Sequence, residues 1–224
     1  MTEISADRVK SLRQRTGAGI MDCRNALAEV GGDEDKAVEL IQKKGLAKAA
    51  KKAGAIAADG MIHAYIHAGS RLGVLVEINC QTDFVARNAD FKEFAQSVGL
   101  QIASMTPLYV RREEIPDADK ERQLALFRAQ MAEEDAASGK SRPAAVADKI
   151  IAGKLDKWIA ESCLVEQASV VDGEKTIGQI SDELTAKLGE KIAVRRFVRF
   201  ELGEGIERKQ ADLAADVAAA LSSS

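Results

Sequence analysis

The only two histidines of the chain, His63 and His67, lie four residues apart and are the first candidates for metal chemistry. On a helix this spacing would place both imidazoles on one face, as in helical zinc sites. The surrounding residues alternate between apolar and polar, which indicates a strand, and four residues of strand separate the two side chains by about 13 Å. No glutamate lies between them and no third ligand spacing is evident nearby. We therefore expect an exposed or partner-facing sheet surface here and no metal site.

The three cysteines are the next candidates, because a thiolate can act as a nucleophile or bind a metal. Cys23, Cys80 and Cys163 are widely spaced, odd in number and outside any Cys-x-x-Cys pattern. This usage is typical of a reducing compartment, and we expect three buried thiols and a cytoplasmic protein. Paired carboxylates such as Glu113-Glu114 are predicted to lie on solvated helical faces. We predict no catalytic residue and no cofactor.

Composition excludes several further classes of protein. The chain has 224 residues, 32 basic and 35 acidic side chains, 46% hydrophobic residues and 4% aromatic residues. No uncharged apolar run of about 18 residues is present, so we expect no membrane contact. Residues 1–56 hold 11 basic and 8 acidic groups, a net charge of +3, and charge is mixed elsewhere. A strong basic stripe is missing, so no direct contact with nucleic acid is expected. A nucleic-acid or ribosome-binding module remains the competing class.

Helical spacing in the first 45 residues predicts three short helices. The second carries apolar residues on one inner face: Ile20, Cys23, Leu27 and Val30. Asp33 is expected to cap the third helix, and Gly45 to end it. Residues 1–55 should therefore form a small three-helix bundle with a thin core, which serves best to present a surface to a partner. The Ala/Lys-rich stretch after Gly45 is interpreted as a linker.

The periodicity then changes, and residues 56–205 predict an α+β core of antiparallel sheet with helices packed on one side. A β-hairpin is expected from residue 61 to residue 78, followed by a long helix that begins at Thr82. Two amphipathic helices across 117–160 predict a helical hairpin. Strands are expected at 164–171 and 192–202, the second with Val194, Val198, Phe200 and Leu202 on one face. Residues 206–224 predict a C-terminal helical tail.

Thr82 to Val85 leave a buried strand and begin a helix. Thr82 is a candidate N-cap, and Asp83 in the first turn would complement the helix dipole. Phe84 beside an acidic residue at a helix start is either a core or staple residue or a contact for a partner. The residue types alone leave both readings open.

At this segment the sequence resembles the bacterial elongation factor Ts family. The stretch from Asn79 to Ala86, Asn-Cys-Gln-Thr-Asp-Phe-Val-Ala, is similar to a signature of that family. Further similar blocks run from Thr16 to Cys23, from Lys175 to Gln179 and from Arg199 to Ile206. The blocks fall in family order over nearly the whole chain.

The resemblance implies a guanine-nucleotide exchange factor for elongation factor Tu that binds both its GDP-bound and its nucleotide-free form. It implies that the bundle is similar to a ubiquitin-associated domain. Asp83 and Phe84, flanked by Thr82 and Val85, would enter the partner near its switch region, displace Mg²⁺ and release GDP without making or breaking a bond. Further implied partner contacts are Ile20, Met21 and His67. The single core resembles the compact form of the family and suggests a homodimer through the core sheet.

Overall fold

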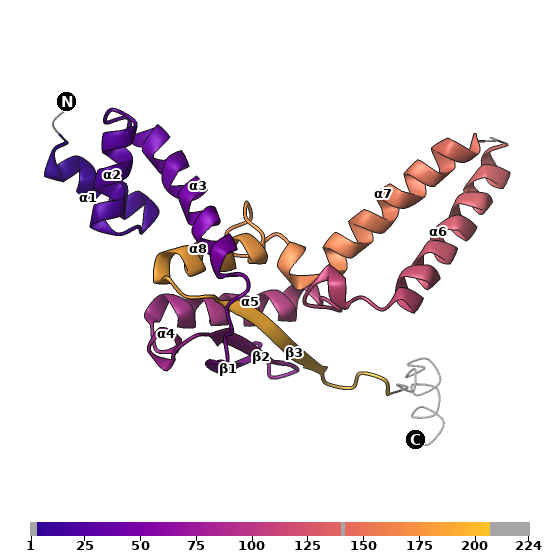
Figure 1. The fold of residues 1–224 in the computed structure, drawn as a ribbon. Helices are drawn as coiled ribbons and strands as arrows, with labels where there is room; N and C mark the ends of the chain where they lie inside the picture. The colour runs from indigo at the N-terminus through magenta and orange to yellow at the C-terminus, as the bar shows by residue number, and fades with distance from the viewer. Residues whose placement is uncertain (1–3, 140–141, 207–224) are drawn as a thin grey trace, which may run out of the picture.

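A three-stranded antiparallel sheet lies beneath a layer of helices in the computed structural model, which describes residues 4–139 and 142–206 (Figure 1). Its strands are β1 (Asp59–Ile66), β2 (Leu72–Cys80) and β3 (Ala193–Glu201), with β2 in the centre. The β1–β2 hairpin and the α+β class agree with the prediction. The predicted tail, 206–224, lies outside the described residues apart from its first residue.

The N-terminal bundle consists of α1 (Ala6–Thr16), α2 (Ile20–Glu29) and α3 (Glu34–Lys52). Asp33 caps α3 as predicted, accepting a hydrogen bond from Lys36 N at 3.1 Å. Gly45 does not end this helix, which continues to Lys52 through the stretch interpreted as a linker. A Cβ at Gly45 would lie 3.3 Å from Ala186 Cβ, so the glycine serves the close approach of α3 and α8 (Ile177–Leu188). Alanine and lysine beyond it are strong helix formers.

The main core lies between the sheet and α5 (Ala89–Met105). One face of β2 is buried, and α5 buries the four residues predicted to share a helical face: Phe91, Phe94, Val98 and Ile102. The helix expected from Thr82 is in fact two helices, α4 (Asp83–Ala86) and α5. Asn88 separates them, because its side chain accepts a hydrogen bond from Asp90 N at 2.8 Å and caps α5.

A β-bulge corrects the predicted faces of β3. Glu77 pairs with Arg196 but its neighbour Ile78 pairs with Val194, so Arg195 is an extra residue in β3. The extra residue reverses the alternation: Val194 is buried in the core, whereas Val198 is 41% exposed on the opposite face. Strict alternation along the sequence could not reveal this shift.

The strand predicted at 164–171 is wrong. The chain forms η2 (Leu164–Glu166), a 3₁₀ turn, followed by an isolated bridge between Ala168 and Thr176. The buried amide of Gln101 holds the segment in place of a ladder, since it donates to Ala168 O at 3.1 Å and accepts from Val170 N at 2.8 Å. The Gln101 side chain thus satisfies two backbone groups, Ala168 O and Val170 N, that a strand would have paired.

The predicted helical hairpin is formed by α6 (Asp117–Ser138) and α7 (Ala144–Ser162), which project together from the core (Figure 1). The 3₁₀ turn η1 (Arg112–Glu114) joins the hairpin to the core. Arg112 donates to both carboxylate oxygens of Glu166, at 2.7 and 2.6 Å. Helix α8 begins with the predicted capping box of Thr176 and Gln179.

Candidate partner-binding site

The single turn of α4 displays Phe84 at the corner between β2 and α5. The Phe84 side chain is 79% exposed, although Val85 beside it packs against the main core and Ala86 is buried. Burial of a phenylalanine side chain is worth about 1.5–3 kcal/mol, so its exposure leaves that free energy available for a partner. The structure therefore excludes the core reading of Phe84 that the residue types had left open.

Asp83 and Thr82 have partners that the sequence did not indicate. Asp83 forms an ion pair with Arg87, one helical turn later, at 2.6 Å. Thr82 occupies the N-cap position, but its hydroxyl caps no amide and donates instead to Glu190 at 2.7 Å. Arg87 could have been suspected from its four-residue spacing from Asp83. Glu190 could not, because it lies 108 residues away in the chain.

Ile20 and Met21 form a second exposed apolar site at the start of α2. Their exposed fractions are 56% and 61%. The prediction that Ile20 shares the inner face of α2 is wrong. The buried residues of this helix are Cys23, Ala26 and Leu27, and all three come later in the chain than Ile20 and Met21. Ile20 is the first residue of the helix, beyond the point where α2 packs on its neighbours.

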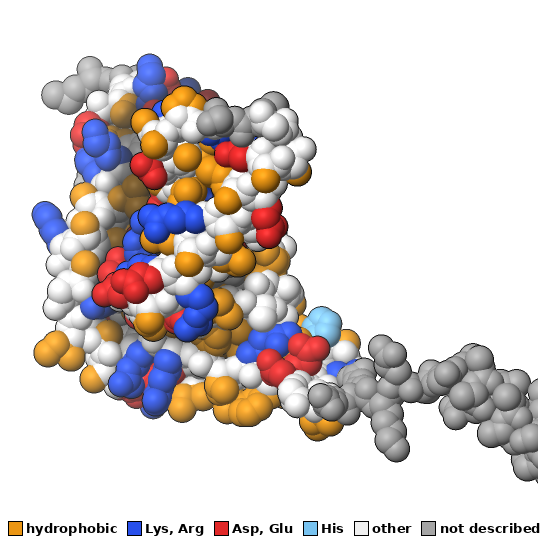
Figure 2. Space-filling view, turned by 90° about the vertical axis from the view of Figure 1, so that its right-hand side faces the viewer, with side chains coloured by type: hydrophobic (Ala, Val, Ile, Leu, Met, Phe, Trp, Pro, Cys, Tyr) orange, Lys and Arg blue, Asp and Glu red, His pale blue; other side chains and the backbone are white. Residues whose placement is uncertain are grey.

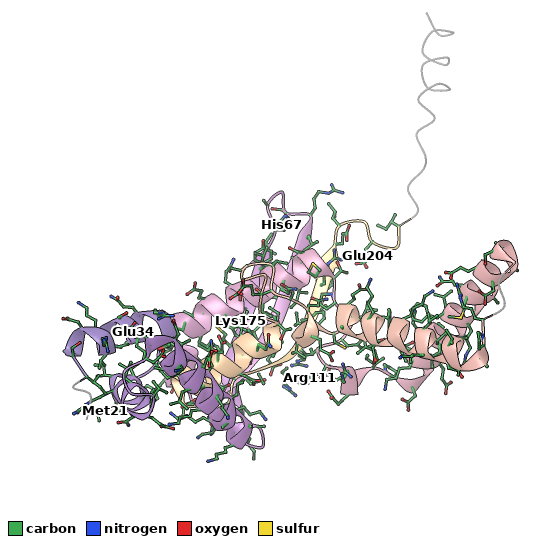
Figure 3. The ribbon with its side chains drawn as sticks, turned by 90° about the horizontal axis from the view of Figure 1, so that it is seen from above. Met21, Glu34, His67, Arg111, Lys175 and Glu204 are labelled. Atoms are coloured by element: carbon green, nitrogen blue, oxygen red, sulfur yellow. The ribbon has the colours of Figure 1, made fainter. Side chains whose placement is uncertain are left out.

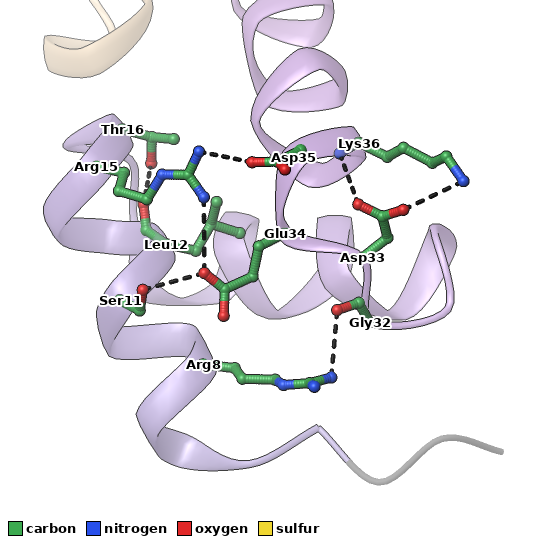
Figure 4. Close-up of polar contacts among 10 residues, drawn as sticks. All are labelled: Arg8, Ser11, Leu12, Arg15, Thr16, Gly32, Asp33, Glu34, Asp35 and Lys36. Atoms are coloured by element: carbon green, nitrogen blue, oxygen red, sulfur yellow. Dashed lines mark hydrogen bonds and ion pairs between the residues drawn. The ribbon is translucent and has the colours of Figure 1, made fainter.

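Polar contacts tie α1 to the start of α3 and so fix the bundle that carries Ile20 and Met21 (Figure 4). Arg15 pairs with Asp35 at 2.8 Å, and the Ser11 hydroxyl donates to Glu34 at 3.1 Å. Arg8 donates to the carbonyl oxygen of Gly32 at 3.3 Å. Exposed pairs of this kind contribute little each, and the buried aliphatic side chains supply most of the bundle's stability.

His67 lies just beyond the end of β1 and has a different neighbour from His63. The His67 Nδ1 atom is 3.0 Å from the Tyr65 hydroxyl, whereas His63 Nε2 is 2.9 Å from Gln96 Oε1. Within the described ranges, no group of three His, Cys, Asp or Glu side chains could hold a metal ion. Figure 3 places Met21 on the bundle and His67 at the hairpin, well apart. The candidate residues thus form separate exposed sites and share no pocket.

Hydrophobic side chains also lie along the sheet surface that no helix of the described residues covers, which we call the open face (Figure 2, lower edge). Glu77 lies at one end of this face, and Arg195 and Arg196 donate to its carboxylate at 2.8 and 2.6 Å. These two guanidinium groups lower the pKa of Glu77 to about 2. The open face consists of side chains that are 41% to 68% exposed: Ile62, Ile66, Leu75, Val198, Phe200 and Leu202.

The fold and these surfaces define an α+β protein with an N-terminal helical bundle that displays apolar side chains at several separate exposed positions. The family model described as Elongation factor TS matches residues 29–204. The chain belongs to the elongation factor Ts family and is a translation elongation factor.

Relatives of this family match over nearly the full chain. Elongation factor Ts of Desulforamulus reducens is 54% identical over 98% of both chains. The protein of the same name from Myxococcus xanthus is 51% identical over 99% of both. In the part of the chain that the structure describes, no helix is long and apolar enough to cross a membrane.

Proposed function

We propose that the protein is a guanine-nucleotide exchange factor for elongation factor Tu. It binds the GDP-bound form, inserts Asp83 and Phe84 near the switch region, displaces Mg²⁺ and leaves the partner free of nucleotide. The observation that carries the proposal is the 79% exposure of Phe84 on a helical turn whose next residue, Val85, packs against the core. Membership of the elongation factor Ts family supports elongation factor Tu as the partner.

Linkage explains how insertion releases the nucleotide. A factor accelerates exchange when it binds the nucleotide-free conformation better than the loaded one, because the same difference in affinity then weakens GDP binding. Mg²⁺ neutralises the phosphates in such sites, so displacing the elements that hold it weakens the phosphate contacts. Phe84 supplies the inserted volume, and Asp83 supplies charge beside it. No covalent bond is made or broken, so this function needs no catalytic residue.

The second and third contacts are Ile20 with Met21 on the bundle and His67 at the hairpin. Several separated contacts suit a factor that must move parts of its partner relative to one another. Linked contacts also raise affinity, since each one that forms increases the effective concentration of the next. Such a partner would be met in the cytoplasm, and the proposal needs no contact with nucleic acid.

We also propose that two copies pair through their open faces. Exposed apolar patches of several side chains commonly mark an interaction surface. The face is built from all three strands, and pairing two copies would cover the same face on both. A sandwich of two sheets is a standard way to bury such faces.

Release of a fluorescent GDP analogue from elongation factor Tu tests the proposed function. The wild-type protein should accelerate release at substoichiometric amounts, and Phe84→Ala should slow release at least about tenfold, equivalent to ~1.4 kcal/mol. Leu126→Ala is the matched control, because it removes an apolar side chain that is 48% exposed on α6. A release rate that the wild-type protein does not change would refute the function. An unchanged rate with Phe84→Ala would refute only the insertion.

A further inference from the structure

The loop between β2 and α4 has no backbone partner for its amides, and one distant carboxylate binds them. The β2–β3 ladder ends at the pair of Asn79 and Ala193. Beyond it, one oxygen of Glu190 accepts from the backbone N–H groups of Gln81 and Thr82, at 3.1 and 2.9 Å. The other oxygen accepts from the Thr82 hydroxyl at 2.7 Å.

Glu190 follows just after α8, and the residues on either side of it are held by this helix. Gly189 ends this helix in the left-handed conformation, with φ of 78°, and directs the chain back towards the sheet. Ile192 N then donates to Thr185 Oγ1 at 3.0 Å, and Ser181 Oγ donates to Ile192 O at 2.9 Å.

A further hydrogen bond, made by a side chain of the loop, joins the same two segments. The side chain of Gln81 accepts from Lys191 N at 3.1 Å, so each segment binds the backbone of the other. Hydrogen bonds to a charged acceptor contribute more to stability than neutral ones. The contacts of Glu190 therefore fix the loop immediately before α4.

This attachment matters because α4 cannot orient itself. It is a single turn of four residues without a side-chain N-cap. A single turn fixes several dihedral angles for one hydrogen bond and is unstable alone. The direction in which Phe84 projects thus depends on what holds the turn, which is Glu190 before it, Asn88 after it and the packing of Val85 and Ala86 against the core.

We propose that Glu190 is a positioning residue for exchange, which holds the turn so that Asp83 and Phe84 enter the partner already oriented. This inference rests on the proposed function. A small displacement of a positioned group can reduce a rate by a large factor, even when the altered residue makes no contact itself. Glu190 contributes orientation, whereas Phe84 makes the contact.

Release of fluorescent GDP, measured over a range of factor concentrations, separates orientation from binding. Glu190→Ala should lower the saturating release rate about tenfold or more. Glu190→Gln keeps an oxygen for the two amides, and it should restore most of that loss. Glu183→Ala is the control on α8, because it removes an exposed ion pair with Lys175 and should leave the rate unchanged.

Labelling of Cys80 by a thiol reagent reports on the loop without any partner. Cys80 is buried, and its thiol donates to Thr82 O at 3.1 Å, so a loosened loop should expose it. Glu190→Ala should increase the labelling rate of Cys80 several-fold and leave that of buried Cys163 unchanged. Glu190→Gln removes the same charge but keeps hydrogen bonds, and it should label almost as slowly as the wild type.

The outcomes separate the two proposals. If the wild-type protein releases no GDP, the proposed function fails. If the wild type is active and Glu190→Ala keeps its full saturating rate, the positioning role is refuted. The role is refuted equally if Cys80 and Cys163 become reactive together, because the variant then unfolds as a whole. A rate that falls with Glu190→Ala, recovers with Glu190→Gln and accompanies labelling at Cys80 alone supports it.

Discussion

Phe84 and Val85 are consecutive residues of α4 with opposite surroundings. The Phe84 ring is 79% exposed, whereas Val85 packs against the main core cluster. The turn therefore separates two tasks between neighbouring side chains: Val85 attaches the turn to the core and Phe84 is free for a partner. Truncation of each residue should separate stability from exchange.

We expect Val85→Ala to lower the free energy of unfolding by about 1 kcal/mol, because it removes methyl groups from a partly buried contact. Phe84→Ala should change the same quantity by less than ~0.5 kcal/mol, as is usual for an exposed site. Urea unfolding followed by circular dichroism measures both. A larger loss of stability in Phe84→Ala than in Val85→Ala would show that the ring supports the fold.

Sequence periodicity predicted those elements whose contacts are local or follow a regular period. The capping box of α8 and the buried face of α5 depend on residues three or four apart, and both agree with the structure. The faces of β3 could not be predicted beyond Val194, since the bulge at Arg195 depends on pairing with Glu77. An extra residue in a strand is determined by its neighbouring strand and leaves no signal in alternation.

The candidate site likewise contains some features that local residue patterns predict and others that they cannot predict. The start of a helix at Asp83 follows from local residue types, and the structure adds that Phe84 is exposed. The Glu190 contact with Thr82 is outside the reach of any local pattern, because it joins segments over a hundred residues apart. For Ile20, the helical period predicted burial, but burial also requires a neighbouring helix, and among the described residues none covers the first turn of α2.

Gly99 on α5 should be intolerant of any side chain. A Cβ at this position would lie 2.8 Å from the Cβ of Tyr65, which shows that helix and strand approach closely there. Alanine is the better helix former by about 1 kcal/mol. We nevertheless expect Gly99→Ala to lower the free energy of unfolding by about 1–3 kcal/mol, because α5 must move away from β1.

Gly153 on α7 is the matched control for that substitution. It also lies inside a helix, but a Cβ there would meet no atom within 4 Å. Gly153→Ala should therefore raise the free energy of unfolding by roughly 0.5–1 kcal/mol. Thermal and urea unfolding of the two variants should shift in opposite directions. If both stabilise the protein, the close contact between α5 and β1 is not limiting.

Cys163 should make the free energy of unfolding depend on pH in the alkaline range. Burial raises the pKa of its thiol from 9.0 to about 11 in the folded protein. Because this pKa is raised on folding, the free energy of unfolding keeps its full value below pH 9 and falls as the pH rises towards 11. In this window the unfolded thiol releases its proton first, and the slope is about 1.4 kcal/mol per pH unit.

Cys163→Ala should remove that dependence. The substitution costs a fixed amount from lost packing at all pH values, so the informative quantity is the difference from wild type between pH 8 and pH 11. The destabilisation relative to wild type should shrink as the pH rises through this range. A difference that stays constant would mean that the thiol has the same pKa in the folded and unfolded chains.

Pairing of two copies through the open face should be sensitive to a single charge. Phe200 is 64% exposed and lies opposite Gly73 of β2, which pairs on its other side with Ile66 of the same face. Phe200→Glu would place two carboxylates in an apolar interface, where an unpaired charge is strongly unfavourable. We expect a dimer of the wild-type chain and a monomer of the variant by analytical ultracentrifugation, with the same circular dichroism spectrum.

The control is Ile150→Glu on α7, which is 37% exposed but far from the sheet and should remain dimeric. A wild-type chain that is monomeric at tens of micromolar would rule out the pairing, and a Phe200→Glu variant that stays dimeric would place the interface elsewhere.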